Sequence, residues 1–324
     1  MWCHARLVAL PMSWLYGKRF VYARAEWDPV VLALRDELYP GPRFSDVRWA
    51  ATRDWLDGAD TYGSRGTVLL AMGNFALVNV YEPLAGVLPL RANALAEVET
   101  QLAAEDKSTQ FVCIGPVNKA LNLLCAFARG DSAALETHLR VADRYLWVAE
   151  DGMKMSGYLN SMVWDASFAV MAVDAVLAVR PGAAALERFM RESKAFLAAN
   201  QVDSDPEQGR RFYRDATLGG WGFSTKENTY IVSDCTAEAL KAMLTRGAPS
   251  PALNRAARVI LAMQNDGDGA WSSYEKRRGH AWYEWFNPAL VFGDIMIDYS
   301  YTEWCAATSL YAHTHTHTHT PARG

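Results

Sequence analysis

Two carboxyl side chains stand four residues apart in the segment Ser-Asp-Cys-Thr-Ala-Glu at positions 233–238. On a helix, Asp234 and Glu238 lie on the same face. An aspartate at a helix start after a serine is most often a helix cap, and from the residues alone that interpretation stays open. A carboxyl group that burial keeps neutral can instead donate a proton. The pair is therefore also a candidate for general acid chemistry.

Aromatic side chains are the second group that could do chemistry. The chain of 324 residues contains 12 Trp, 14 Tyr and 12 Phe, and this number of tryptophans exceeds what core packing normally requires. Ring faces attract positive charge. The composition therefore indicates a use of ring faces, although any single ring could be an ordinary buried core residue.

Other kinds of chemistry lack their motifs. The sequence has no G-x-G-x-x-G after a predicted strand, no P-loop, no H-E-x-x-H and no G-x-S-x-G, so nucleotide, zinc-protease and serine-hydrolase chemistry have no support. Five cysteines at irregular spacings predict neither a disulfide framework nor a CxxC metal site. A net charge of −4 without a long basic run gives no reason to expect nucleic acid as a partner.

Segments of helical periodicity must position these side chains. Half of the chain is apolar, which is enough for a substantial core. Ser250-Pro251 is a typical helix start, with a cap followed by proline. The predicted amphipathic helices are Leu90–Leu102, Val117–Ala128, Ser132–Val148, Trp164–Val179, Ala184–Ala199, Asp234–Arg246 and Pro251–Met263.

Helices joined by short turns predict an all-α fold of paired helices, either stacked as a solenoid or closed as an α/α barrel. A domain boundary is expected near Glu150, where a new helical series follows Asp151-Gly152. Residues 313–320 alternate His and Thr strictly. The preferred interpretation is a low-complexity tail, and weak metal binding by the histidines is the alternative.

The longest apolar stretch, Thr67–Tyr81, is too short to span a bilayer and ends at Glu82-Pro83. It could still dip into one leaflet. The N-terminal residues lack the charged region, continuous apolar stretch and cleavage site of a signal peptide.

Two segments share a pattern in which Gln is followed by a Gly-Trp pair or a Gly-x-Trp triplet. They are Gln201 with Gly220-Trp221, and Gln264 with Gly269-Ala270-Trp271. The second resembles the QW repeat of the triterpene cyclases. In such a repeat the Gln amide is expected to bond N–H groups at the start of a neighbouring helix and to lie against the Trp ring. The repeat predicts the fold and bears only indirectly on function.

The segment Trp221–Ala242 resembles the region around the Asp-Cys-Thr-Ala-Glu motif of the oxidosqualene cyclases, which is Asp234–Glu238 here. Further segments resemble the same enzymes in the same order. These are Trp2–Arg6, Leu10–Ser13, Asp151–Met155 through Trp164-Asp165, Tyr274–Gly279, and Asn287-Pro288 with Val291–Tyr299. Over residues 1–312 the chain is identified as a partial member of this family, of the lanosterol and cycloartenol synthase type.

The resemblance implies an α/α barrel (toroid) architecture with QW repeats in two incomplete domains. Residues 1–150 correspond to the C-terminal part of an inserted barrel domain, and residues 151–312 to the first part of the catalytic barrel domain. Residues 313–324 form the His-Thr tail. The implied reaction is cyclisation of (S)-2,3-oxidosqualene to a tetracyclic sterol precursor, with no metal or organic cofactor and no obligate protein partner.

By resemblance, Asp234 is the proton donor that opens the epoxide, and Cys235 is one of its hydrogen-bond partners. Glu238 is placed to relay a fresh proton through water. His4 and Tyr274 fall where the family places the pair near the terminal cation, which takes the last proton. A single Asp in Ser-Asp-Cys, instead of the Asp-rich cluster of the squalene-hopene cyclases, favours the epoxide over squalene.

Aromatic residues that line the cavity and contact the substrate are assigned, by position in the matched motifs, to Trp2, Trp164, Phe223 and Phe292. For Phe292 a core position is an equal alternative. The positions that steer the product correspond to Tyr158, Asn228 and Val232. Asn228 and Val232 favour lanosterol over cycloartenol, whereas Tyr158 fits either product.

The chain departs from the family at one point near its end. The family reads Tyr-x-Glu-Cys, and this Cys is the second partner of the acid, whereas this chain reads Tyr301-Thr-Glu-Trp304-Cys305. One residue on a helix is about 100° of rotation, so contact of Cys305 with Asp234 is in doubt.

Family members are more than twice as long as this chain, so the chain expressed alone is expected to be inactive or insoluble. Alternative interpretations are a non-catalytic fragment, a squalene-type cyclase, and an α/α barrel glycosidase, which would need a second carboxylate with equal motif support. A lipid substrate predicts a membrane surface as partner. The segment Thr67–Leu90 or the N-terminal segment would bind monotopically to the cytosol-facing side of the endoplasmic reticulum or a lipid droplet.

Overall fold

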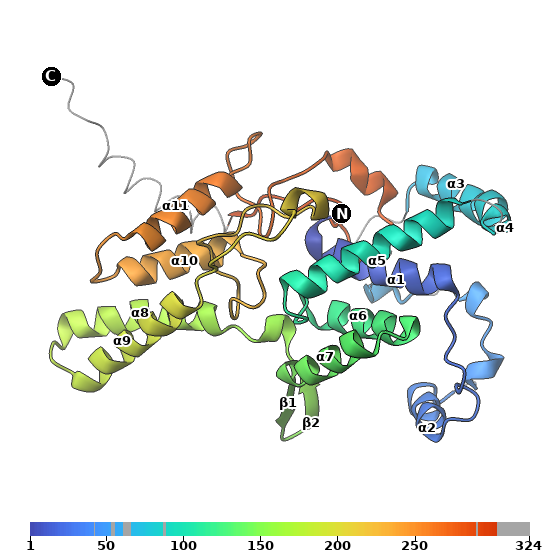
Figure 1. The fold of residues 1–324 in the computed structure, drawn as a ribbon, viewed down its shortest axis with the longest axis horizontal. Coiled ribbons are helices and arrows are strands. Elements are labelled where there is room, and N and C mark those ends of the chain that lie inside the picture. The colour runs from blue at the N-terminus through green and yellow to red at the C-terminus, as the bar shows by residue number, and fades with distance from the viewer. Residues whose placement is uncertain (42, 53–55, 61–65, 87–88, 290, 303–324) are drawn as a thin grey trace.

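The computed structural model describes residues 1–302 apart from 42, 53–55, 61–65, 87–88 and 290, and the side chains of Ala50 and Tyr158 also lie outside the described part. Trp304, Cys305 and the His-Thr tail are outside it as well. The described chain is mostly helical, in line with the predicted all-α class, and its helices form two groups along an elongated molecule (Figure 1).

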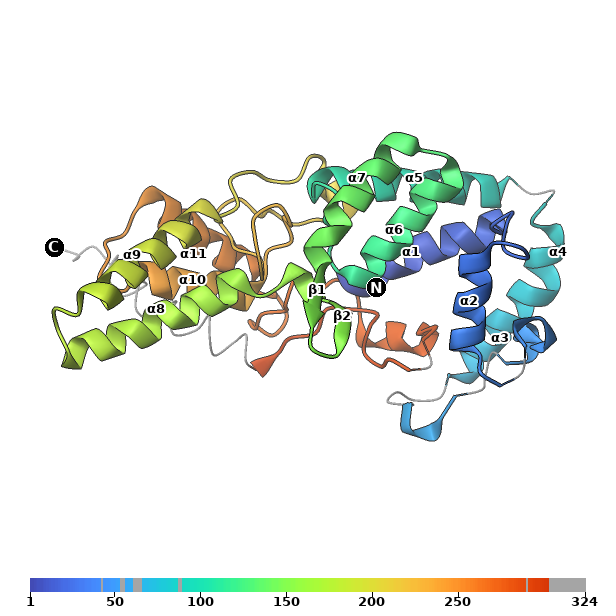
Figure 2. The ribbon, with the colours of Figure 1, turned by 90° about the horizontal axis from the view of Figure 1, so that it is seen from below.

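The first group contains α1, α5, α6 and α7, with α2, α3 and α4 at its outer end (Figures 1 and 2). Helix α6 packs against α1 and α7, and α5 packs against α1. Asp28 caps α2, and Asp131 caps α7, through hydrogen bonds to backbone N–H groups in the first turn of each helix. The bounds are α1 Cys3–Lys18, α2 Pro29–Leu38, α3 Val68–Ala76, α4 Glu82–Leu84, α5 Leu90–Ser108, α6 Pro116–Arg129 and α7 Ser132–Ala142.

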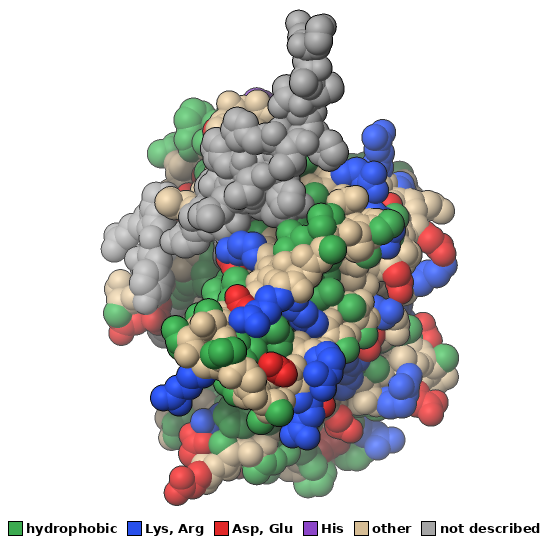
Figure 3. Space-filling view, turned by 90° about the vertical axis from the view of Figure 1, so that its left-hand side faces the viewer, with side chains coloured by type: hydrophobic (Ala, Val, Ile, Leu, Met, Phe, Trp, Pro, Cys, Tyr) green, Lys and Arg blue, Asp and Glu red, His purple; other side chains and the backbone are tan. Residues whose placement is uncertain are grey.

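The second group contains α8 (Met162–Val179), α9 (Ala184–Ala199), α10 (Ser233–Leu244) and α11 (Pro251–Met263). Helix α10 packs against the other three. Val163, Trp221, Leu240 and other apolar side chains form one continuous buried cluster between them. At the outer end of this group, Lys, Arg, Asp and Glu are interspersed with hydrophobic side chains on the surface (Figure 3).

A hairpin of β1 (Leu146–Ala149) and β2 (Gly152–Met155) leads from the first group towards the second. The strands are antiparallel, with Leu146 opposite Met155 and Ala149 opposite Gly152. The predicted helix Ser132–Val148 is therefore wrong after Ala142. The aromatic and β-branched residues of Leu146–Val148 pair with β2, whose first residue, Gly152, has a φ of 117°. The domain boundary predicted near Glu150 falls inside this hairpin and stays a prediction.

The other predicted helices are all present, with small differences at their ends. Leu90–Leu102 extends to Ser108, and the Asp234 helix begins one residue earlier and ends at Leu244. The start of α11 at Ser250-Pro251 is confirmed, because Ser250 Oγ accepts a hydrogen bond from Leu253 N–H at 3.3 Å.

The Trp of each Gln…Trp segment bonds the end of the preceding helix, and only the Gln of the first segment reaches a neighbouring helix. The indole N–H of Trp221 donates to the carbonyl oxygen of Leu197 near the end of α9, and that of Trp271 donates to Ile260 near the end of α11, both at 2.8 Å. Gln201 donates to Ala252 O in the first turn of α11 at 3.0 Å. The Gln amide thus reaches a neighbouring helix start as expected, but it bonds a carbonyl oxygen there and not an N–H group.

The apolar stretch after Thr67 forms α3, a π-helical turn (Leu77–Tyr81) and α4. Its apolar side chains remain exposed in the described structure, and Phe75 is 69% exposed. By length and composition alone, α8 is the one helix in the described ranges that could cross a membrane. Helix α8 packs against α9 and α10, and only 22% of it is buried in the described structure.

Candidate active site

Helix α10 places Asp234 in its first turn, inside the molecule. Nine residues of this twelve-residue helix are buried, and Asp234 is only 2% exposed. The preceding Ser233 is fixed to the chain around residue 273. Its backbone N–H donates to Ser273 O at 2.9 Å, and its hydroxyl donates to Ser272 O at 2.7 Å. The acid is thus held where the start of α10 meets the chain at residues 272–273.

The environment of Asp234 favours its neutral form. Burial raises the pKa of its carboxyl to about 6, although hydrogen bonds from the backbone N–H and thiol of Cys235 partly oppose this. The N–H of Cys235 lies 2.6 Å from Asp234 Oδ1. Burial also raises the pKa of the Cys235 thiol well above its ordinary value. The pair therefore consists of a weakly acidic carboxyl and a protonated thiol, which suits a proton donor.

Glu238 lies one turn along the same helix and is also buried. Its Oε1 pairs with Lys241 Nζ at 2.5 Å. Its Oε2 has no hydrogen-bond partner among the described residues. A free carboxylate oxygen close to the acid is compatible with a proton relay, and the relay itself stays a prediction.

Trp2, His4 and Tyr274 form one aromatic group. The ring centroids of His4 lie 4.9 Å from Trp2 and 4.7 Å from Tyr274, so the structure brings together a predicted pair from opposite ends of the chain. Burial lowers the pKa of His4 to about 4. A neutral imidazole beside a phenol is able to accept a proton.

Trp164 and Phe223 form a second aromatic group. Their rings are stacked with centroids 5.8 Å apart, and the backbone N–H of Trp164 donates to the backbone carbonyl oxygen of Phe223 at 3.4 Å. Phe168, which the sequence did not single out, packs edge-on against Trp164 at 4.7 Å. Phe292 joins neither group, because its side chain is 64% exposed in the described structure.

Two of the predicted product-steering residues are buried between the helical groups. Val232 N–H donates to Trp221 O at 3.0 Å, and Asn228 donates from its amide to Cys113 O at 3.2 Å. The backbone of Tyr158 lies in a short 3₁₀ turn (Gly157–Leu159), while its side chain is outside the described part.

Two buried carboxyl groups near Tyr274, Glu275 and Asp298, and the half-buried Arg6 were missed by sequence reasoning as contributors to the site. Asp298 accepts hydrogen bonds from the backbone N–H groups of Ser273, Tyr274 and Glu275 at 2.9–3.4 Å, and burial raises its pKa to about 7. Arg6 forms two parallel contacts of 3.2 Å with Glu275. All three residues lie in segments that resemble the family, and this was the signal from which their place in the site could have been predicted. A cleft of about 410 Å³ adjoins them and is lined by Trp2, Arg6, Glu275, Tyr283, Met296 and Asp298, among others.

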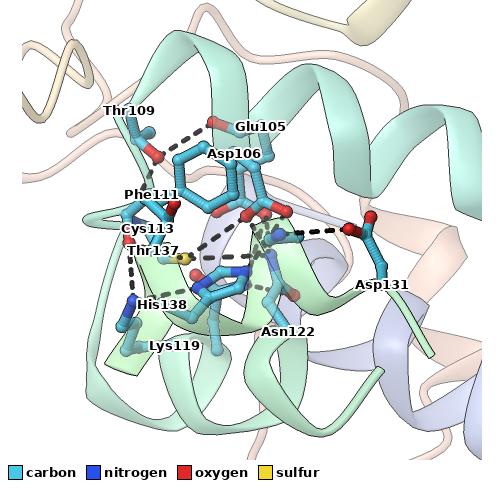
Figure 4. Close-up of polar contacts among 12 residues, drawn as sticks. Glu105, Asp106, Thr109, Phe111, Cys113, Lys119, Asn122, Asp131, Thr137 and His138 are labelled. Atoms are coloured by element: carbon cyan, nitrogen blue, oxygen red, sulfur yellow. Dashed lines mark hydrogen bonds and ion pairs between the residues drawn. The ribbon is translucent and has the colours of Figure 1, made fainter. Parts of the chain in front are cut away.

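A buried polar cluster between α5, α6 and α7 was also missed (Figure 4). Glu105, Asp106, Lys119 and His138 are all buried. Burial, followed by the charge of Asp106, raises the pKa of Glu105 to about 7, and burial lowers the pKa of Lys119. Nothing in the sequence marked these residues, because a polar residue at a core position of a predicted helix is read as a surface residue.

The cluster contains three atoms of types that bind transition metals, from Asp106, Cys113 and His138, within 4.8 Å of one another. Each histidine nitrogen already faces a protein group. Lys119 Nζ is 2.9 Å from His138 Nδ1, and Asp106 Oδ2 is 3.3 Å from His138 Nε2. Asn122 donates to Asp106 Oδ1 at 3.1 Å. A polar network in which Lys119 is the cation accounts for the short distances between these three atoms.

Comparison with known proteins finds relatives along nearly the whole chain. The chain is 37% identical over 319 residues to lanosterol synthase of Homo sapiens, covering 95% of this chain and 42% of that protein. It is 38% identical over 320 residues to cycloartenol synthase of Dictyostelium discoideum, covering 96% and 44%. It is 34% identical over 334 residues to protostadienol synthase A of Aspergillus fumigatus, covering 99% and 43%.

No family model matches the chain. The chain spans less than half the length of these curated relatives.

Proposed function

Because the chain belongs, as a partial sequence, to the oxidosqualene cyclase family, we propose that the complete protein cyclises (S)-2,3-oxidosqualene to a tetracyclic sterol precursor. The observation that carries the proposal is the Asp234 carboxyl, which is buried and has a pKa raised to about 6. Epoxide opening requires the protonated carboxylic acid, and the raised pKa increases the protonated fraction of Asp234 at every pH above about 4.

The reaction begins when Asp234 transfers its proton to the epoxide oxygen and the adjacent carbon–oxygen bond breaks. The resulting carbocation is attacked by the neighbouring double bond, and ring closures follow in sequence. At the end a carbon-bound proton is lost to the His4 and Tyr274 pair, whose rings are in contact. Glu238 then returns a proton to Asp234 through water. No redox step occurs, since the product is an isomer of the substrate.

The cationic intermediates need stabilisation without a nucleophile that would quench them. The faces of Trp2, Trp164, Phe223 and Phe292 supply it, at about 0.5–2 kcal/mol per ring. The two ring groups seen in the described structure support this role. For Phe292, the role requires that segments of the complete protein cover its ring.

Lanosterol is the favoured product over cycloartenol. The support is the residue types at Asn228 and Val232, both of which are buried. Tyr158 is the third steering position. Relatives named for both products match the chain at similar identity, so identity alone does not select between them.

The architecture we propose is that of two incomplete α/α barrel domains, with residues 1–150 in the inserted domain and 151–312 in the catalytic one. The paired helices and the matching hydrogen bonds of Trp221 and Trp271 support this arrangement and the assignment of QW repeats.

A membrane surface is the proposed partner, at the endoplasmic reticulum or a lipid droplet. The support is the exposed apolar side of α3 and α4 and the exposed Trp282 and Trp285 beside α3, since tryptophan favours the membrane interface. Complete release of the complete protein by carbonate washing would contradict this partner.

A second candidate is a fragment without activity, because the chain spans less than half of its relatives. Expression of the complete coding sequence and of this chain alone in a cyclase-deficient host separates the two. We expect lanosterol from the complete sequence and none from the chain alone. The complete protein with Asp234→Asn should lose at least about 100-fold of its activity, while Asp151→Asn, at an exposed hairpin position, should retain it. Unchanged turnover in Asp234→Asn would contradict the proposal.

A further inference from the structure

The loop between α5 and α6, residues 109–114, has an unusual backbone. Three of its non-glycine residues, Gln110, Phe111 and Cys113, have φ values of 50°, 62° and 66°. L-residues rarely adopt this left-handed region, and they keep it only where the surroundings enforce it. The loop is therefore held in a conformation that it would not adopt by itself.

Side chains of Lys119 in α6, of Tyr145 in the turn after α7, and of Thr109 in the loop itself hold successive peptide groups of this loop. Lys119 Nζ donates to Phe111 O at 2.8 Å, and the hydroxyl of Tyr145 donates to Val112 O at 2.9 Å. Thr109 Oγ1 accepts from Cys113 N–H at 3.0 Å. All three of these side chains are buried, so water does not compete for these hydrogen bonds.

The buried polar cluster orients the first of these side chains. Lys119 contacts His138, and His138 faces Asp106 on the neighbouring helix, as Figure 4 shows. The cluster is thus connected to the loop through Lys119.

On its other side the loop contacts a product-steering residue. Cys113 O accepts the amide N–H of Asn228 at 3.2 Å, and Asn228 Oδ1 accepts the backbone N–H of Tyr230 at 3.2 Å. Both ends of the Asn228 amide are therefore fixed. Val112 also packs in one buried cluster with Leu159, the residue after Tyr158.

We propose that the loop 109–114 is a specificity-determining element: it acts through the Cys113 carbonyl group on Asn228, and through Leu159 on the backbone beside Tyr158, and so selects the product. This inference rests on the proposed cyclase function. Thr109, Lys119 and Tyr145 are positioning residues in it, since they act on the site only through the loop.

The test uses the complete protein in a cyclase-deficient host, with total sterol and the ratio of products as separate readouts. Tyr145→Phe and Thr109→Val each remove one hydroxyl that holds the loop. We expect each to change the product ratio about fivefold, the factor that corresponds to one hydrogen bond. Thr109→Ser keeps the hydroxyl and should restore the ratio.

Ser167→Ala is the matched control, because its buried hydroxyl bonds only within α8, to Val163 O. It should leave the ratio unchanged. An unchanged ratio in Tyr145→Phe and Thr109→Val, with or without a loss of total sterol, would overturn the proposal. Absence of any sterol from the unaltered protein would instead overturn the proposed function. Should neither variant accumulate, Cys113→Gly is used instead. Glycine adopts many φ values, so the carbonyl group of residue 113 is no longer held towards Asn228. The ratio must then shift, and an unchanged ratio would refute the proposal.

Discussion

The interior of the α1, α5, α6 and α7 group differs in kind from that of the α8–α11 group. The first contains a small apolar cluster around Trp14 and, beside it, a network of buried polar and charged side chains. The second is filled by one continuous apolar cluster. Apolar contacts stabilise without regard to direction, whereas hydrogen bonds and ion pairs fix orientation at a cost in desolvation.

The segment of residues 219–234 joins the two interiors. Trp221 lies in the apolar cluster, Asn228 contacts the loop that the polar network holds, and Asp234 lies at the start of α10. We infer from this comparison that the apolar group contributes stability alone, whereas the polar group also fixes the geometry of the site. The predictions that follow separate these two contributions.

Lys119→Met should have the largest effect on stability. It removes the buried cation that contacts His138 and interacts with the charge of Asp106, and loss of one partner from a buried charged network costs about 3–5 kcal/mol. The measurement is the free energy of unfolding of the complete protein. Adding Asp106→Asn to Lys119→Met should recover part of the loss. A cost below about 1 kcal/mol would mean that the network is not charge-balanced as described.

Leu197→Ala tests the apolar group. Leu197 is fully buried between α9 and its neighbours, so the substitution should cost about 2–5 kcal/mol of unfolding free energy. The product ratio should stay the same, because the cavity left by the substitution removes only apolar contacts, which do not fix orientation. A changed ratio, as expected for the loop variants, would remove the distinction between the two interiors.

Cys113 provides the smallest and most specific test. At its φ of 66°, glycine is favoured over alanine by roughly 1 kcal/mol, so Cys113→Gly should be more stable than Cys113→Ala. Within helix α10 alanine is favoured over glycine instead, so Ala237→Gly should lose about 1 kcal/mol of unfolding free energy. Equal stability of the two Cys113 variants would argue that the loop is not strained.

The sequence predicted most of the helices and the contacts carried by motifs. The periodicity of Pro251–Met263 located α11, and the matched motifs brought His4 and Tyr274 together although 270 positions separate them. Hydrophobic periodicity failed at Ser132–Val148, because it does not distinguish the last turns of an amphipathic helix from a strand that pairs with residues downstream.

The polar network and the loop could not be predicted in the same way. Lys119 and His138 look like surface residues of amphipathic helices, and only the packing of three helices buries them. A left-handed φ at Phe111 or Cys113 has no signal in residue type, since such positions usually carry glycine or asparagine. Phe292 shows the converse problem, as a motif position whose ring is exposed in the described structure.

The most direct test of the account measures the protonation of Asp234 by infrared difference spectroscopy. The spectra compare the complete protein with Asp234→Asn as the pH is raised. Its folded pKa of about 6 lies above the ordinary value of 3.8. The neutral acid therefore stabilises the fold below about pH 4, and this contribution is lost as the pH rises through 6. We predict a protonated-carboxyl band that disappears with a midpoint near pH 6. A midpoint at or below the ordinary value of 3.8 would show that burial does not favour the protonated acid, and it would contradict the proposed role as the proton donor.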